Sequence, residues 1–97
     1  MEVEPSNCHQ SLQVLADKTR LAIVRRLMEA PCHVNELNDV VQIEQSLLSH
    51  HLKVLRDSGL VSSERDGKAV LYKLADEVRI GDDGGINLGC CQLNFDS

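Results

Sequence analysis

The sequence predicts an α+β fold, mainly α, of the winged helix-turn-helix type, with a two-stranded wing and a short extended C-terminal tail. Three observations predict it. Residues 45–57 have an apolar and a polar face at helical spacing, residues 34–41 form a shorter helical pattern before them, and two β-prone runs joined by Asp66-Gly67 follow. A short helix, a tight turn and a longer helix make a helix-turn-helix unit, and a hairpin beside it makes the wing.

The length of 97 residues is that of one small domain. We expect a disordered leader over 1–7, the winged helix-turn-helix domain over 8–75, and a flexible linker with a cysteine-bearing tail over 76–97. With one Tyr, one Phe and no Trp, the core must be aliphatic, and we expect a second chain to supply extra buried surface. No apolar stretch could cross a bilayer and no signal peptide is visible, so we expect a cytoplasmic protein without membrane contact.

The first two helices are predicted from spacing and capping. Pro5 argues against an earlier start, and Leu12, Leu15 and Ala16 give a short amphipathic helix over 8–16. Asp17 is a plausible N-cap for a second helix over about 18–30, which Pro31 ends. The residues expected to face inward on this second helix are Leu21, Val24, Leu27 and Met28.

The helix over 45–57 has the pattern of a DNA recognition helix. Its apolar stripe at i, i+3, i+4, i+7 consists of Leu48, His51, Leu52 and Leu55. The opposite face consists of hydrogen-bond donors: Ser46, Ser49, His50, Lys53 and Arg56. A donor-rich face suits the acceptors of the major groove. A merely solvated helix would look partly similar, so the hairpin that follows is what favours DNA binding.

That hairpin is predicted from Asp66-Gly67 between extended runs, which favours a type I′ turn with positive φ at both residues. Arg65 and Lys68 flank its tip. The net charge is −5, but residues 45–73 hold five bases against three acids, and the tails are acidic. This distribution permits DNA binding with few phosphate contacts and a shallow salt dependence.

Three segments together resemble the ArsR/SmtB family of bacterial metal-responsive repressors. Residues 15–27 (LADKTRLAIVRRL) look like the family's opening, residues 46–61 (SLLSHHLKVLRDSGLV) like its recognition helix and next strand, and residues 67–74 (GKAVLYKL) like its wing. The resemblance implies a homodimeric repressor that leaves operator double-stranded DNA when an inducer binds. Its candidate DNA-facing residues here are Gln45, Ser46, Ser49, His50 and Lys53, with Arg65 and Lys68 on the wing. We do not expect an enzyme, because the sequence shows no glycine-rich phosphate loop and no spacing of a nucleophile, a base and an orienting group.

Two histidines in the recognition helix have different expectations. His50 stands where the family usually has Arg, which weakens the charge at that place. His51 matches a common family histidine on the inward side, so we expect a packed and hydrogen-bonded role for it.

The four cysteines are Cys8, Cys32, Cys90 and Cys91. Without a secretory signal, metal or redox chemistry is favoured over structural disulfides. The family's Cys-x-Cys site aligns with His33 and Asn35 and is therefore absent. Its C-terminal carboxylate-histidine site has no match either, because no His follows His51. The vicinal pair Cys90-Cys91 resembles that of some arsenic-responsive members.

Arsenite and antimonite are soft and three-coordinate, and three thiolates satisfy them best. Cys90 and Cys91 supply two, Cys8 is our choice for the third, from the same or the other protomer, and Cys32 is the alternative. Neighbouring side chains of a regular strand point to opposite faces, so the chain must bend near Gly89 for both sulfurs to share one ion.

Three alternatives stay open. The vicinal cysteines can be small buried side chains that close a terminal strand. The same thiols can form a reversible disulfide with Cys8 or Cys32, which would make a redox or sulfur sensor. The domain can also be a DNA-binding or interaction module without a ligand.

Overall fold

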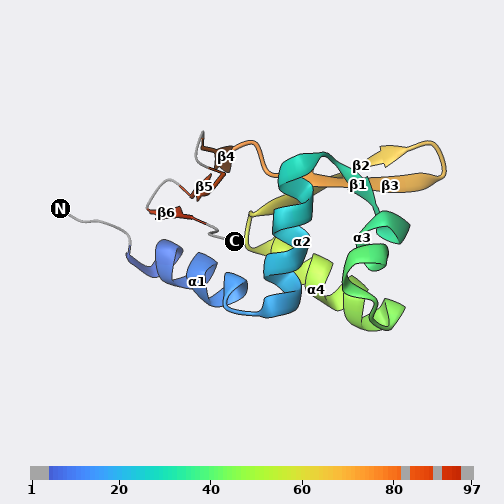
Figure 1. The fold of residues 1–97 in the computed structure, drawn as a ribbon, viewed down its shortest axis with the longest axis horizontal. Coiled ribbons are helices and arrows are strands. Elements are labelled where there is room, and N and C mark those ends of the chain that lie inside the picture. Colours follow the sequence, from blue (N-terminus) through green and yellow to red (C-terminus); the bar gives the residue numbers. More distant parts are fainter. Residues whose placement is uncertain (1–4, 82–83, 89–90, 95–97) are drawn as a thin grey trace.

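The computed structural model describes residues 5–81, 84–88 and 91–94, and in it the chain forms four helices and two small antiparallel sheets (Figure 1). The helices are α1 (Pro5–Leu15), α2 (Lys18–Glu29), α3 (Val34–Val41) and α4 (Gln45–Asp57). The strands are β1 (Cys32–His33), β2 (Val61–Asp66), β3 (Ala69–Leu74), β4 (Arg79–Ile80), β5 (Ile86–Asn87) and β6 (Gln92–Leu93). The predicted winged helix-turn-helix fold is confirmed.

Helix α1 begins earlier than the sequence predicted. It starts at Pro5 rather than Cys8 and ends one residue before Ala16. The expectation of a disordered leader is therefore wrong for residues 5–7, while residues 1–4 lie outside the described part of the chain. The physical reason is that Pro is well tolerated in the first turn of a helix, where an N–H has no intrahelical acceptor and φ is already helical.

The start of α2 is confirmed in detail. Asp17 is the N-cap, and its Oδ1 accepts hydrogen bonds from the backbone N–H of Thr19 at 2.9 Å and of Arg20 at 3.0 Å. These two groups have no acceptor within the helix, so the cap satisfies both. The helix ends at Glu29, and Ala30 is extended before Pro31, as the residue before a proline prefers.

The capping of α2 makes one contribution to stability depend on pH. Hydrogen bonds from the backbone of Arg20 and Thr19, together with the charge of Arg20, hold the pKa of Asp17 below its ordinary value. A carboxyl whose pKa is lower in the folded state stabilises the fold above its unfolded-state pKa, and this contribution is lost as the pH falls through the folded-state pKa. We expect Asp17→Ala to lower the free energy of unfolding by about 1 kcal/mol at neutral pH and to flatten its acid dependence below pH 4. Denaturant titrations between neutral pH and pH 3 measure both; Asp17→Asn should keep most of the cap and lose the acid dependence.

A tight turn joins α3 to α4. Gln42 adopts the left-handed region with φ of 52°, and its N–H donates to the carbonyl of Asn38 at 2.8 Å. The next N–H, of Ile43, donates to Asn38 Oδ1 at 3.0 Å. A left-handed residue at the end of a helix reverses the chain while satisfying the last carbonyls. The observed bounds of α3 and α4 agree with the predicted 34–41 and 45–57.

The wing belongs to a three-stranded sheet in the order β1-β3-β2. Asp66 pairs with Ala69, so Gly67 and Lys68 are the central residues of the turn, and of these two only Gly67 has a positive φ, 67°. The predicted type I′ turn is therefore wrong, because the pattern is that of type II′, which needs a positive φ only at its first central residue. This arrangement spares Lys68 a left-handed backbone and keeps Asp66 in the strand. The short strand β1, which the sequence did not predict, pairs with the middle of β3.

The C-terminal segment forms a second sheet in the order β4-β5-β6, where only an extended tail was expected. The chain reverses between Leu88 and Cys91, whose N–H and carbonyl are joined at 2.8 Å. Ile86 is only 1% exposed and belongs to the same core as Ile23 and Leu27 of α2. This sheet lies with α1 at one end of the 45 Å long molecule, while the wing and α3 lie at the other (Figure 1).

The core is aliphatic, as expected from the composition. Its large side chains with less than 2% exposure are Ile23, Leu37, Leu48, Leu52, Leu55, Ile86 and Val24. They come from α2, α3, α4 and β5, so burial of this core ties the C-terminal sheet to the helix-turn-helix. Within the described ranges, every helix is too short or too polar to cross a membrane.

Candidate functional site

Helix α4 presents two separate faces, as its sequence pattern predicted. The predicted inward residues Leu48, His51, Leu52 and Leu55 are all buried. Gln45, Ser46, Ser49, His50, Lys53 and Arg56 are all exposed. The exposed side chains form one donor-rich surface, which we call the α4 face.

Two donors of the α4 face contact neighbouring carboxylates. Lys53 Nζ lies 2.8 Å from Asp57 Oδ2, and this contact lowers the pKa of Asp57. Ser46 Oγ donates to Glu44 Oε1 at 3.3 Å. Both contacts are exposed, and exposed ion pairs on one helix are weak. Both donors can therefore exchange their carboxylate partner for another acceptor at little energetic cost.

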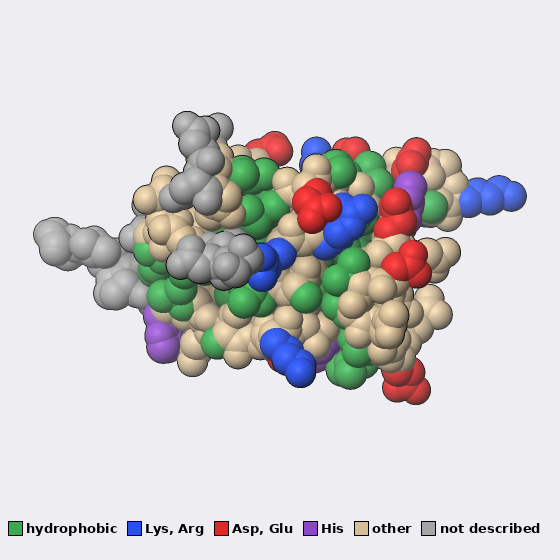
Figure 2. All heavy atoms as spheres, in the orientation of Figure 1, with side chains coloured by type: hydrophobic (Ala, Val, Ile, Leu, Met, Phe, Trp, Pro, Cys, Tyr) green, Lys and Arg blue, Asp and Glu red, His purple; other side chains and the backbone are tan. Residues whose placement is uncertain are grey.

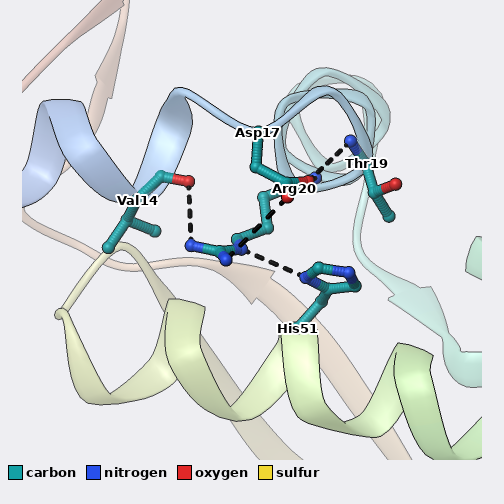
Figure 3. A network of polar contacts seen from close by, with 5 residues as sticks. All are labelled: Val14, Asp17, Thr19, Arg20 and His51. Atoms are coloured by element: carbon teal, nitrogen blue, oxygen red, sulfur yellow. Dashed lines mark hydrogen bonds and ion pairs between the residues drawn. The ribbon is translucent and has the colours of Figure 1, made fainter.

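On the other side of α4, His51 is part of a polar network that the sequence did not predict (Figure 3). Its side chain is 7% exposed, and its Nδ1 accepts a hydrogen bond from Arg20 Nε at 3.1 Å. Since Nδ1 accepts, the ring is neutral with its proton on Nε2. The packed and hydrogen-bonded role expected for His51 is confirmed. The sequence showed no sign of Arg20 as its partner, because the two lie on different helices.

The wing tip carries the two predicted basic residues in exposed positions, Arg65 and Lys68. Figure 2 shows basic side chains that project at the wing end of the molecule, with acidic and histidine side chains beside them. His33 Nε2 donates to Asp66 Oδ2 at 2.9 Å, and the backbone N–H of His33 donates to Glu36 Oε1 at 2.8 Å. The first contact joins the start of α3 to the wing tip, next to the backbone pairing of β1 with β3. In the sequence, His33 stood out only as a position where the family has a thiolate.

The structure brings together two cysteines from opposite ends of the chain. Cys8 Sγ on α1 lies 3.1 Å from Cys91 Sγ, 83 residues away in the sequence. Cys8 takes part in a disulfide, whereas Cys32 is a free thiol. Cys90, the other predicted thiolate ligand, lies outside the described residues. Of the predicted ligands that are described, Cys8 and Cys91 are therefore brought together.

Cys32 has a different environment. It is completely buried in β1, and its Sγ lies 3.4 Å from the carbonyl oxygen of Ala30. Burial raises the pKa of its thiol, which keeps the sulfur protonated and unreactive. Among the residues that the structure describes, no three His, Cys, Asp or Glu side chains are arranged to hold a metal ion. The predicted set of three thiolates includes Cys90, so it lies partly outside these residues.

Comparison with known proteins identifies the family. Residues 17–63 match the family described as bacterial regulatory protein, arsR family. The HTH-type transcriptional repressor SmtB of Mycobacterium tuberculosis is 48% identical over 65 residues, which cover 67% of this chain and 48% of that protein. The structure of HlyU from Vibrio cholerae N16961 matches with a TM-score of 0.73 and 33% identity, covering 78% of this chain and 83% of that one. The chain belongs to the ArsR family.

A third relative within the ArsR family is the arsenical resistance operon repressor of Bacillus subtilis, 38% identical over 70% of this chain and 66% of that protein. The chain spans about half the length of SmtB, and 55 to 66% of some other relatives. These relatives are transcriptional regulators, in agreement with the expectation that the domain is not an enzyme. HlyU of Vibrio cholerae is described as an activator, so family membership alone does not decide between repression and activation.

Proposed function

We propose that this ArsR-family chain is a homodimeric, cytoplasmic repressor that trivalent arsenic or antimony releases from operator DNA. The α4 face would contact the major groove through Gln45, Ser46, Ser49, His50 and Lys53, and Arg65 and Lys68 would follow on the wing. Cys8, Cys90 and Cys91 would hold the metalloid. The likeness to an arsenical resistance operon repressor supports this choice of inducer.

The contact between Cys8 and Cys91 is the observation that carries the proposal. Three sulfurs on one small ion must lie close together, and two of the three candidates are 3.1 Å apart. The chain reverses between Leu88 and Cys91, so Cys91 does not continue β5. Cys91 lies before β6, outside a regular strand, and the alternation of side chains between two faces applies to regular strands.

Release from DNA would follow from the geometry of a dimer. Two recognition helices must lie about 34–36 Å apart to enter successive turns of the major groove. A ligand that holds α1 and the C-terminal sheet in a new relative position tilts the protomers and spoils this spacing. A coupling of about 1–3 kcal/mol, or roughly 5- to 150-fold in affinity, is typical for such a device.

A second candidate is a redox or sulfur sensor of the same fold. It is favoured by the disulfide in which Cys8 takes part, and a reduced form of HlyU is among the similar structures, with a TM-score of 0.70. In this case oxidation of the thiols, rather than a metalloid, would change DNA binding. The two candidates use the same cysteines and differ only in the signal.

Operator release by the reduced protein separates the two candidates. Gel-shift titrations use the native promoter duplex, with arsenite, antimonite, peroxide or polysulfide added in turn. We expect arsenite to lower the affinity about 5- to 150-fold, and Cys8→Ser, Cys90→Ser and Cys91→Ser each to abolish most of that response. Cys32→Ala is the matched control, because it removes a buried thiol that is not one of the three proposed ligands. It should respond like the unmodified protein.

Two outcomes contradict the arsenic proposal. Release by peroxide or polysulfide but not by arsenite under reducing conditions identifies the redox sensor. An arsenite response that survives Cys90→Ser and Cys91→Ser together shows that the site is elsewhere. Sedimentation equilibrium of the reduced protein tests the homodimer directly.

A further inference from the structure

Arg20, in the first turn of α2, contacts two other helices and the N-cap of its own helix (Figure 3). Its Nη1 donates to the carbonyl oxygen of Val14 in α1 at 3.3 Å, and its Nε donates to His51 Nδ1 in α4 at 3.1 Å. Its Nη2 lies 3.9 Å from Asp17 Oδ2, the N-cap of its own helix. One guanidinium group therefore joins the helix that carries Cys8 to the recognition helix.

The planar geometry of the Arg20 guanidinium links the directions of its two hydrogen bonds, to Val14 and to His51. A guanidinium is planar, with its donors in a fixed fork, so the bond to Val14 and the bond to His51 cannot be adjusted separately. The side chain of Arg20 is only 20% exposed. A donor or acceptor that lost its partner there would be costly, because water could not fully replace the hydrogen bond. A change in the direction of the Val14 carbonyl therefore has to move Arg20, which is itself the hydrogen-bond partner of His51.

The packing between α1 and α4 leaves room for such a change. An open surface groove of about 370 Å³ lies between Gln13 and Val14 of α1 and Val54 and Asp57 of α4, with Arg20 in its wall. Leu15, at the end of α1, is buried in the core with 5% exposure. On this side α1 borders open space, so a shift of α1 together with Val14 meets no packed side chains of α4 in the groove.

We infer that Arg20 is a positioning residue that transmits the state of the Cys8 and Cys91 thiols through Val14 to His51 on α4. The inference rests on the proposed role of these thiols as the sensing site, but not on which signal they sense. In the structure, where Cys8 takes part in a disulfide, Arg20 bonds to both Val14 and His51. When reduction or a ligand moves α1, the Val14 carbonyl leaves, Arg20 shifts, and the inner side of α4 loses its fixed partner.

The test follows α4 directly and needs neither DNA nor a known inducer. Amide hydrogen exchange in 45–57 and the ¹⁵N shifts of the His51 ring are measured on the full chain, reduced, oxidised, and reduced with arsenite. In the unmodified protein we expect the change of thiol state to alter exchange in α4 roughly 5- to 150-fold and to shift the His51 Nδ1 signal. In Arg20→Gln both differences should vanish, while the number of arsenite-reactive thiols stays the same.

Two further variants keep the result decisive. Lys18→Gln, which replaces an exposed residue at the start of α2, is the matched control and should behave like the unmodified protein. Arg20→Lys retains the charge but cannot form the fork, so it should give a reduced response even if Arg20→Gln folds poorly. The inference is overturned if α4 and His51 do not change with thiol state in the unmodified protein. It is also overturned if they change in both Arg20 variants as much as in the unmodified protein.

These outcomes are independent of the proposed function. If arsenite leaves DNA binding unchanged while oxidation still alters His51 through Arg20, the arsenic proposal fails and the transmission through Arg20 stands. If arsenite releases the unmodified protein from DNA and releases Arg20→Gln and Arg20→Lys just as readily, the arsenic proposal stands. In that case Arg20 does not connect the thiols to α4.

Discussion

Ser49→Ala combined with Lys53→Ala is expected to weaken operator binding by roughly ten- to hundredfold. Both side chains are exposed on the α4 face, at the spacing that lets them reach the same groove. A good base contact contributes about 1–3 kcal/mol, whereas a lysine contact to phosphate contributes equally on all sequences. We therefore expect specific binding to fall more than non-specific binding, and the slope of log affinity against log salt to decrease by about one for each phosphate contact that is removed.

This double variant should not unfold the domain. Both positions are exposed, alanine is a good helix former, and the pair of Lys53 with Asp57 that the substitution removes is itself exposed and weak. Thermal unfolding followed by circular dichroism checks this, and Lys18→Ala on α2 serves as the control for loss of one positive charge. Unchanged operator affinity would remove α4 as the DNA-contacting helix, and a lowered melting temperature would mean that binding was weakened through the fold.

Gly85→Ala is expected to separate Cys91 from Cys8 without changing any cysteine. A Cβ atom at Gly85 would collide with the backbone carbonyl oxygen of Leu93 and with Asn94 Oδ1. Backbone atoms cannot move aside as a side chain can, so β5 and β6 must part. The expected result is loss of most of the inducer response, about 5- to 150-fold in affinity, with DNA binding in the absence of inducer retained.

The thiol geometry can be measured separately from function. The rate at which a short bifunctional thiol reagent joins Cys8 to the C-terminal cysteines should fall strongly in Gly85→Ala, since the bridging reaction needs the sulfurs side by side. Gln92→Ala, an exposed position on β6, is the control and should react like the unmodified protein. Rapid bridging in Gly85→Ala would show that the C-terminal sheet is not what holds Cys91 next to Cys8.

The difference between predictable and unpredictable features follows the range of the interactions. The helices α2, α3 and α4 were predicted closely because their signals are local in the sequence. These signals are the cap Asp17, the helix-ending Pro31 and the spacing of Leu48, Leu52 and Leu55. The start of α1 was missed because Pro5 is compatible both with a non-helical segment and with the first turn of a helix. The turn type at Gly67 was missed because strand register, which is set by pairing with β3, decides which residues occupy its centre.

The sequence alone determined a winged helix-turn-helix with a donor-rich outer surface on α4, and three of its segments resembled the ArsR/SmtB family. The fold and the α4 face follow from local and periodic patterns, so burial of one side of each element is enough to specify them. Only the tertiary structure decided which distant groups meet: Cys8 with Cys91, Arg20 with His51, and His33 with Asp66, separated by 83, 31 and 33 residues. No local pattern encodes such pairs, because the shared aliphatic core brings together the segments that carry them.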